Sequence, residues 1–479
     1  MTYVSTVAVD PLPPDRFTQV LGRPAADQLL EALGRAATVF QGRVIWNVNS
    51  TATGGGVAEL LRSLLAYARG ADVDVRWAVI KGNPDFFDVT KRIHNHLHNF
   101  IGDGGELGDG ERAVYEEALR PNAEEFRTMV APGDVVILHD PQTAGLVPMV
   151  KDLGVPVVWR CHVGIDEPGQ LARAAWDFLR PYVVPADAYV FSRQAFVWDR
   201  LEPKKIHMIP PSIDAFSPKN VELDGPTVTA ILVAAGLTES DGPLAQPQFT
   251  RASGAVGRVE RKAEVFQDVA ATSADRLVVQ VSRWDSLKDP IGVMEGFARH
   301  IAPNSDAHLV YAGPAVEAVA DDPEGAEVLR AAIALWRHFP SQQRKQIHLA
   351  CLPMIDGEEN AAMVNALQRR ASVVVQKSIA EGFGLTVAEA MWKGRPVVAS
   401  RIGGIQDQIE DGKTGLLLDD PADLEAYGTA VLSLLADDRW AAAIGTAGME
   451  RVRERFLASR SLLQYMQLMG DLIGQPVPD

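Results

Sequence analysis

Short apolar runs alternate with amphipathic segments through most of the chain. In the first half these runs lie at residues 44–48, 73–80, 135–138, 157–159, 188–191 and 206–209. A second set follows at 277–281, 308–312, 346–352, 371–376 and 396–400. Apolar runs of this length, separated by helical patterns, are typical of parallel strands in α/β proteins. The pattern therefore predicts two α/β halves of similar architecture, each with a mainly parallel sheet.

Polar and proline-rich segments between the runs indicate the domain boundaries. Residues 210–214 contain two prolines, which disfavour regular strand pairing and suggest a connector. Residues 238–262 are rich in Gly, Ser, Pro and Gln, and we expect them to form a mobile loop or insertion, not a fold element. The expected division is an N-terminal extension (1–40), a first domain (41–215), a second domain (216–450) and a C-terminal helix (451–479) that is a candidate for returning to the first domain.

Composition narrows the class of protein. A chain of 479 residues is too long for one ordinary core, and its 47% hydrophobic and 23% charged residues are normal for a soluble protein. The formal charge of −16 disfavours a nucleic-acid partner. Two cysteines cannot form a disulfide framework, and the sequence shows neither a signal peptide nor an apolar stretch of about 18 residues. We therefore expect a cytoplasmic protein with no membrane partner.

A glycine cluster follows the first apolar run. Asn49 is followed by Gly54, Gly55 and Gly56, where a helix is expected to begin, and the free N–H groups of such a turn favour anions or hydroxyls. The cluster is neither a G-x-G-x-x-G fingerprint nor a P-loop. The next run ends in Lys81 and not in the acidic residue that holds a nicotinamide ribose. A ligand loop and a plain tight turn remain equally open.

Two cations follow the run at 277–281. Arg283 and Lys288 lie five positions apart in an expected turn, so a guanidinium fork and an ammonium could converge on one diphosphate. The ends of strands in open α/β sheets are where ligands bind. The alternative is a pair of solvated charges in a loop.

A third motif begins with Glu381 and includes Glu389. Glycines ahead of a helix expose backbone amides to sugar hydroxyls, and carboxylates accept paired hydrogen bonds from vicinal diols. We expect the two glutamates near one face, two helical turns apart. An acidic helix start explains Glu381 but explains Glu389 poorly. The residues between them that contribute to the expected donor site are Gly382, Phe383, Gly384, Leu385 and Thr386.

Two histidine motifs also follow apolar runs. One runs from His139 through Asp140 to Gln142, and the other places His162 after 157–159. Their comparable positions favour a shared cleft, although a single histidine is more often structural. The histidines at 94, 96 and 98 do not share one helix face and have no supporting carboxylates, so we expect no metal site.

The third motif resembles the donor-binding signature of family 4 retaining glycosyltransferases. More specifically, the chain resembles the trehalose glycosyltransferring synthases over about residues 40–470. The motifs that carry the resemblance are 45–52 with the following Gly-Gly-Gly-Val-Ala-Glu, and 82–87, 90–92, 139–142, 211–214 and 381–393. The departures are the first 40 residues and the segment 238–262.

The resemblance implies a GT-B fold of two facing Rossmann-like domains with the active site between them. It implies that Arg283 and Lys288 hold a nucleoside diphosphate, that Glu381 and His162 contact the transferred sugar, and that Glu389 holds the ribose. Gly55 and Gly56 would meet the donor from the first domain. Free glucose would lie near Asn49, Lys91, Asp140 and Gln142.

The implied reaction makes trehalose reversibly from a nucleoside diphosphate-glucose and glucose, with no metal or other cofactor. A retaining trehalose phosphorylase, a transferase with another acceptor such as a sugar phosphate, a non-catalytic sugar-binding protein and a dinucleotide-dependent oxidoreductase are the alternatives. The intact donor positions count against the sugar-binding protein, and Lys81 counts against the oxidoreductase. We expect a homodimer. No pattern identifies the base of the nucleotide or the preferred direction.

Overall fold

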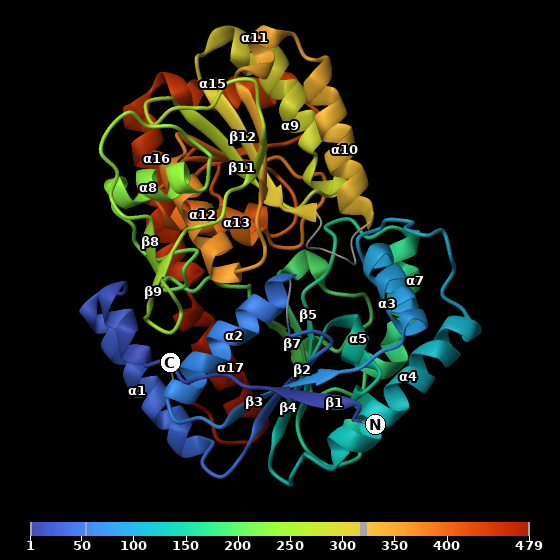
Figure 1. Cartoon of the computed structure of the whole chain (residues 1–479). Helices are drawn as coiled ribbons and strands as arrows, with labels where there is room; N and C mark the ends of the chain where they lie inside the picture. Colours follow the sequence, from blue (N-terminus) through green and yellow to red (C-terminus); the bar gives the residue numbers. More distant parts are fainter. Residues whose placement is uncertain (1, 53–54, 317–322, 478–479) are drawn as a thin grey trace. The chain divides into compact units, whose positions relative to one another are not determined.

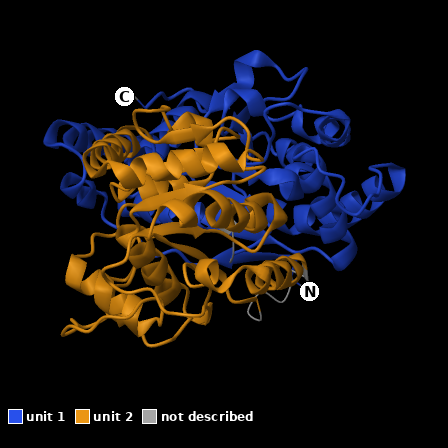
Figure 2. Cartoon of the chain, turned by 90° about the horizontal axis from the view of Figure 1, so that it is seen from above, with its two compact units in different colours: residues 1–212, 456–479 blue, residues 213–455 orange. Residues whose placement is uncertain are grey.

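The structure is a computed structural model that describes residues 2–52, 55–316 and 323–477. The chain divides into two compact units (Figure 2). The first comprises Met1–Ser212 together with Phe456–Asp479, and the second comprises Ile213–Arg455. Each unit is an α/β structure around one large sheet, as the alternating pattern predicts. Among the described residues, no helix has both the length and the apolar character needed to cross a membrane.

The sheet of the first unit has seven strands in the order β1-β3-β2-β4-β5-β6-β7. All neighbours are parallel except β1, which pairs antiparallel with β3. The strands are β1 (Val4–Val7), β2 (Ile45–Asn49), β3 (Val75–Ile80), β4 (Val135–His139), β5 (Val157–Cys161), β6 (Ala188–Phe191) and β7 (Ile206–Met208).

The first 40 residues are more than an extension of this unit. Residues Val4–Val7 form an edge strand of the sheet, with Val4 opposite Ile80. They are followed by helix α1 (Arg23–Val39), which packs against the last helix of the chain, α17 (Ala458–Leu472). α17 also packs against α2 (Gly55–Gly70). The N-terminal segment therefore completes the sheet and its helical cover.

Helices cover both faces of the first sheet (Figure 1). α17 packs against both α1 and α2 on one side, and the helices on the other side surround a large apolar core. The remaining helices of the unit are α3 (Pro84–Leu97), α4 (Asp109–Arg127), α5 (Asp140–Ala144), α6 (Val147–Lys151) and α7 (Gln170–Val183).

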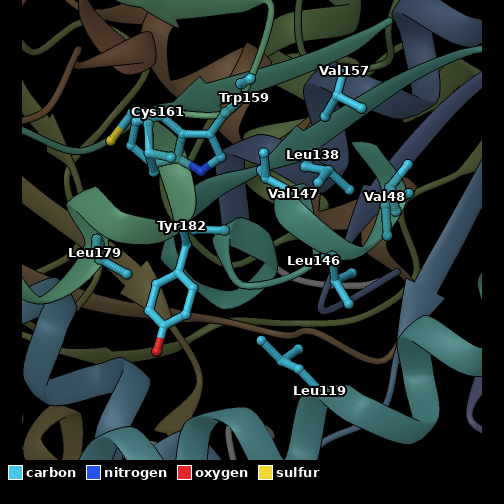
Figure 3. Close-up of a cluster of buried hydrophobic side chains, with 14 of the residues drawn as sticks. Val48, Leu119, Leu138, Leu146, Val147, Val157, Trp159, Cys161, Leu179 and Tyr182 are labelled. Atoms are coloured by element: carbon cyan, nitrogen blue, oxygen red, sulfur yellow. The ribbon is translucent and has the colours of Figure 1, made fainter. Parts of the chain in front are cut away.

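The apolar core uses every second residue of the central strands. Leu138, Trp159 and Cys161 point into it from β4 and β5, and Tyr182 reaches it from α7 (Figure 3). Because successive side chains of a strand point to opposite faces, the intervening residues lie on the other face. That other face carries the polar residues of the strand ends.

The second unit repeats the architecture with the order β10-β13-β12-β11-β14-β15-β16, in which only β10 is antiparallel. The strands are β10 (Glu264–Phe266), β11 (Leu277–Val281), β12 (His308–Pro314), β13 (Ile347–Leu352), β14 (Val373–Gln376), β15 (Val397–Ser400) and β16 (Leu416–Leu418). The helices are α8 (Gly225–Ala234), α9 (Pro290–Gly296), α10 (Pro323–His338), α11 (Ser341–Arg344), α12 (Gly357–Arg370), α13 (Leu385–Trp392), α14 (Ile405–Gln408), α15 (Leu424–Ala436) and α16 (Asp438–Arg455).

The expectation of a mobile loop over 238–262 is wrong for its second half. That part forms a hairpin of β8 (Gln248–Thr250) and β9 (Val256–Arg258). Arg251 in the turn lies 2.7 Å from Asp356 and 2.8 Å from Glu358, at the start of α12. These ion pairs fix the turn of the hairpin to the start of α12.

Candidate active site

The two cations of the second unit lie in the turn after β11. Asp285 organises this turn, because its Oδ1 accepts a hydrogen bond of 2.9 Å from the Leu287 N–H and its Oδ2 lies 2.6 Å from Arg283 Nη2. The Arg283 side chain is 64% exposed. A guanidinium that is held at one end and open to solvent is suited to binding a mobile anion.

Lys288 lies at the other end of the turn and contacts Glu381. Its Nζ is 2.7 Å from Glu381 Oε2, and both side chains are largely buried. The turn and the Glu381 loop are joined by the backbone as well, because the Ile379 N–H donates to the Leu287 carbonyl over 2.8 Å. The structure thus brings together two residues that are 93 positions apart in the sequence.

A buried ion pair stands behind Lys288. Lys377 directly follows β14, is fully buried and pairs with Asp289. The buried Gln280 side chain links the same two segments, since its Nε2 donates to the Lys288 carbonyl over 2.8 Å and its Oε1 accepts from the Lys377 N–H over 3.2 Å. Lys377 and Gln280 were not predicted as site residues, although both lie in or directly after predicted strands.

The Glu381 loop leads into helix α13 through a left-handed residue. Gly384 caps the helix with φ of 80°, a conformation that favours glycine. Thr386 Oγ1 donates to Gln376 Oε1 over 2.9 Å, which ties the first turn to β14. The Phe383 side chain is buried, whereas Gly382, Leu385 and Thr386 are partly exposed. The loop therefore presents backbone and small groups to solvent and places its phenyl ring in the interior.

A second glycine turn supports this loop and was missed in the sequence. Gly403 has φ of 47°, and a Cβ there would lie 1.9 Å from the Glu381 carbonyl oxygen. The Gly404 N–H donates to the Gly382 carbonyl over 2.9 Å, and Gln408 Nε2 donates to the Phe383 carbonyl over 2.5 Å. The signal available in the sequence was a glycine pair shortly after the apolar run at 396–400.

Glu389 lies within α13, whereas Glu381 lies in the loop before it. Because α13 begins at Leu385, the two glutamates are not separated by two turns of one helix, as the sequence had suggested. Glu389 is 3% exposed, and its Oε1 is 3.6 Å from Lys219 Nζ. Lys393 Nζ donates to the Glu389 carbonyl over 3.0 Å. Burial lowers the pKa of Lys393 to about 7, while the nearby Glu389 charge opposes the shift.

The first unit has a chain of polar side chains at the carboxyl ends of β2, β4 and β5. His139 Nε2 is 3.1 Å from Asn47 Oδ1, and His139 Nδ1 is 3.2 Å from His162 Nε2. Because an amide oxygen only accepts, His139 carries its proton on Nε2 and accepts from His162. Burial lowers the pKa of His139 to about 3 and that of His162 well below its usual value, and the Arg160 charge adds to both shifts. Both rings are therefore neutral at neutral pH.

Asp140 is held beside this pair in a strained conformation. Its φ is 65°, and its Oδ1 accepts a hydrogen bond of 2.7 Å from the His162 N–H. Burial raises the pKa of Asp140 to about 6, while the His162 N–H and the Arg160 charge oppose the rise. A non-glycine residue with positive φ at a strand end is a common mark of a functional site.

The remaining predicted residues of the first unit have separate surroundings. Asn49 is buried, accepts from Trp77 Nε1 over 2.8 Å and donates to the Thr51 carbonyl over 2.7 Å. Gln142 is partly exposed on α5, and Lys91 is exposed on α3. Gly55 and Gly56 begin α2, whereas Gly54 lies outside the described residues. No group of three metal-ligating side chains occurs in the part of the chain that the structure describes.

Comparisons with known proteins show the family to which the chain belongs. The profile of the family "Trehalose synthase, N-terminal domain" matches residues 47–198, and that of "Glycosyl transferases group 1" matches residues 261–451. A protein from Rubrobacter xylanophilus named trehalose synthase is 34% identical over 96% of both chains. The chain belongs to the trehalose synthase family. A trehalose synthase from Thermococcus litoralis is 32% identical over 95% of this chain and 96% of that one.

More distant relatives share the fold at lower sequence identity, and one of them matches this chain over only half of its own length. A trehalose phosphorylase from Pleurotus sajor-caju is 28% identical over 77% of this chain, but over only 50% of its own length. Among solved structures, a UDP-forming α,α-trehalose-phosphate synthase from Burkholderia vietnamiensis has a TM-score of 0.65 at 17% identity, covering 91% of this chain and 99% of that one. Sucrose-phosphate synthase from Thermosynechococcus elongatus has a TM-score of 0.61 at 18% identity, covering 90% and 99%. These structures confirm the GT-B fold.

Proposed function

We propose that this chain transfers glucose from a nucleoside diphosphate-glucose to free glucose and so forms trehalose. Its near-full-length identity to proteins named trehalose synthase supports the product. The observation that carries the donor assignment is the contact between Lys288 and Glu381 at the ends of β11 and β14, with the exposed Arg283 in the same turn. An acidic protein that keeps two cations at strand ends is suited to an anionic ligand.

The second unit holds the donor. Arg283 offers a planar fork and Lys288 a point charge, which together neutralise a diphosphate. Glu381, held by Lys288, accepts hydrogen bonds from hydroxyls of the transferred glucose. Glu389 binds the ribose diol, and its contact with Lys219 then has to rearrange, because the carboxylate is buried.

The first unit holds the acceptor. The carboxylate of Asp140 and the amide of Gln142 stand at the start of α5 and bind glucose hydroxyls, while the neutral His162 contacts the transferred sugar. Asn49 acts indirectly, because its side chain is engaged with Trp77 and Thr51. Lys91 on α3 is the most exposed of the acceptor candidates.

The transfer forms one glycosidic bond and breaks one. The anomeric hydroxyl oxygen of glucose attacks the donor C1 on the face of the departing diphosphate, the C1–O–phosphate bond breaks, and the hydroxyl proton passes to a β-phosphate oxygen. Retention results without the two close carboxyl groups that a retaining hydrolase needs. The protein contributes positioning and stabilisation of the charge on the departing phosphate.

Product analysis tests this proposal. Purified protein is incubated with glucose and, in separate reactions, UDP-, ADP- or GDP-glucose or glucose 1-phosphate. Trehalose together with free nucleoside diphosphate is the expected result, and it identifies the preferred base. Trehalose formed only from glucose 1-phosphate would assign the chain to phosphorolysis, the activity that the fungal relatives' name suggests. No trehalose in any reaction would contradict glucose as the acceptor.

A further inference from the structure

Arg160 is a buried cation that the assignments above do not use. It lies on β5 between Trp159 and Cys161, which point into the apolar core, so its side chain lies on the opposite face of the sheet. His139 is its register partner on β4. Arg160 therefore shares the polar face and the strand ends with the histidine pair.

The Arg160 side chain is completely buried, and most of its hydrogen-bond donors have no partner in the described part of the chain. Its Nη2 donates to Ser192 Oγ over 3.2 Å, while its Nε and Nη1 have no hydrogen-bond partner among the described residues. No carboxylate of the described chain lies within ion-pair distance of it. A buried charge without a paired carboxylate lowers stability, so its presence calls for a functional reason.

Asp140 is the carboxylate that the sheet places near Arg160. It directly follows His139, the register partner of Arg160, and its Oδ1 accepts from the N–H of His162, two residues beyond Arg160. The other titratable groups that sense the Arg160 charge are His139, His162, Cys161 and Tyr465 of α17. Burial raises the pKa of the Cys161 thiol and of the Tyr465 phenol and lowers that of both histidines, so all four are neutral at neutral pH. Of these groups, Asp140 is the one that can carry a negative charge at neutral pH, and the Arg160 charge lowers its pKa.

We propose that Arg160 is a positioning residue whose buried charge keeps Asp140 ionised, so that the carboxylate can accept a hydroxyl of the sugar acceptor. The contact from the His162 N–H fixes the orientation of Asp140, and Arg160 fixes its charge. The part concerning the acceptor rests on the function proposed above, whereas the effect on the charge of Asp140 does not.

The expected effect has a defined sign. The pKa of Asp140 is about 6 with Arg160 in place, and Arg160 lowers it. Loss of the positive charge therefore raises the pH at which Asp140 ionises, by about one unit, the typical effect of a nearby charge. At pH 7 the KM for glucose should then rise about twofold, and at pH 6 about fivefold, while the KM for the donor stays unchanged. Above about pH 8.5 the difference in the KM for glucose should vanish.

The experiment measures the titration of Asp140 and the KM for glucose between pH 5 and 9. The carboxyl carbon of Asp140 is followed by NMR in protein labelled at aspartate and assigned with Asp140→Asn. The test variant is Arg160→Met, with Arg160→Gln as its substitute if the methionine variant does not fold. The matched controls are Arg160→Lys, which keeps the charge, and Ser192→Ala, which removes the hydrogen bond of Arg160 but leaves its charge.

An upward shift of the Asp140 titration in Arg160→Met but not in either control supports the proposal. Identical titrations in wild type and Arg160→Met would overturn it, whatever the enzyme makes. A shift without any trehalose formation would support the electrostatic role and contradict the proposed function instead. An equal shift in Ser192→Ala would show that the local packing, and not the charge, sets the titration, and would also overturn the proposal.

Discussion

Replacing Asp289 with Asn removes one charge from the buried pair behind Lys288. Asp289 has three roles: it pairs with Lys377, its Oδ1 accepts from the Gly292 N–H over 2.9 Å to cap α9, and it adopts a positive φ of 50°. Asparagine caps helices and tolerates this conformation nearly as well as aspartate. The substitution therefore changes the charge of the side chain and little else, and it leaves Lys377 buried without its anion.

The magnitude follows from the burial of the pair. Lys377 is fully buried and the Asp289 side chain is 17% exposed. Removing one partner of a buried ion pair costs about 3–5 kcal/mol, and the partial exposure of Asp289 favours the lower end. For a unit of this size a loss of about 3 kcal/mol lowers the melting temperature by roughly 6–12 °C. The turn also carries Lys288, so the KM for the donor should rise together with the loss of stability.

Urea unfolding and calorimetry of four proteins test the reasoning: wild type, Asp289→Asn, Lys377→Met and the double variant. If the charge pair is the cause, the double variant is more stable than the sum of the single losses predicts, because no charge is left buried alone. A stability of Asp289→Asn within about 0.5 kcal/mol of wild type, the size of an ordinary surface substitution, would contradict a stabilising ion pair. Single losses that add without coupling would contradict it equally.

Three further outcomes are expected. Lys288→Met should lower kcat/KM about 100-fold through loss of one electrostatic donor, whereas Lys413→Met at an exposed position should leave the rate unchanged. Gly403→Ala should be clearly less stable in urea than Gly412→Ala: both have positive φ, but a Cβ at Gly412 meets nothing within 4 Å. Asp140→Asn should abolish trehalose formation yet match or exceed wild-type stability at pH 7. The raised pKa of Asp140 means that the folded wild type loses stability as pH rises from about 4 to 6, and a melting series from pH 4 to 8 measures this loss.

The sequence predicted the central strands well, because they are buried on both faces. Every predicted apolar run corresponds to a parallel strand, as with the run at 277–281 and β11. Of the four edge strands of the two large sheets, β7 was predicted and the other three were missed. The missed strands β1, β10 and β16 have three or four residues each, and β1 and β10 alternate buried and exposed positions imperfectly. Short edge strands depend on a neighbour for their hydrogen bonds, so they carry little pattern of their own.

Several residues of the candidate site could be singled out from short motifs in the sequence. Arg283, Lys288 and Glu381 each follow a strand, and the sequence singled out each of them separately. The contact between Lys288 and Glu381 came only with the structure. Arg160 and Lys377 were missed, because a charged residue within or directly after an apolar run gives no sign of which distant group it faces. Their importance depends on tertiary burial, which no local spacing encodes.

The packing of α17 has a consequence for synthesis. This helix follows the whole second unit in the chain, yet it packs on α1 and α2 of the first. On a ribosome, residues 213–455 must be made before the first unit receives its last helix, a delay of roughly 12–50 s at ordinary elongation rates. During that interval the apolar surface of α1 and α2 on which α17 packs stays uncovered. A nascent chain in that state is the natural target of chaperones that bind exposed hydrophobic segments.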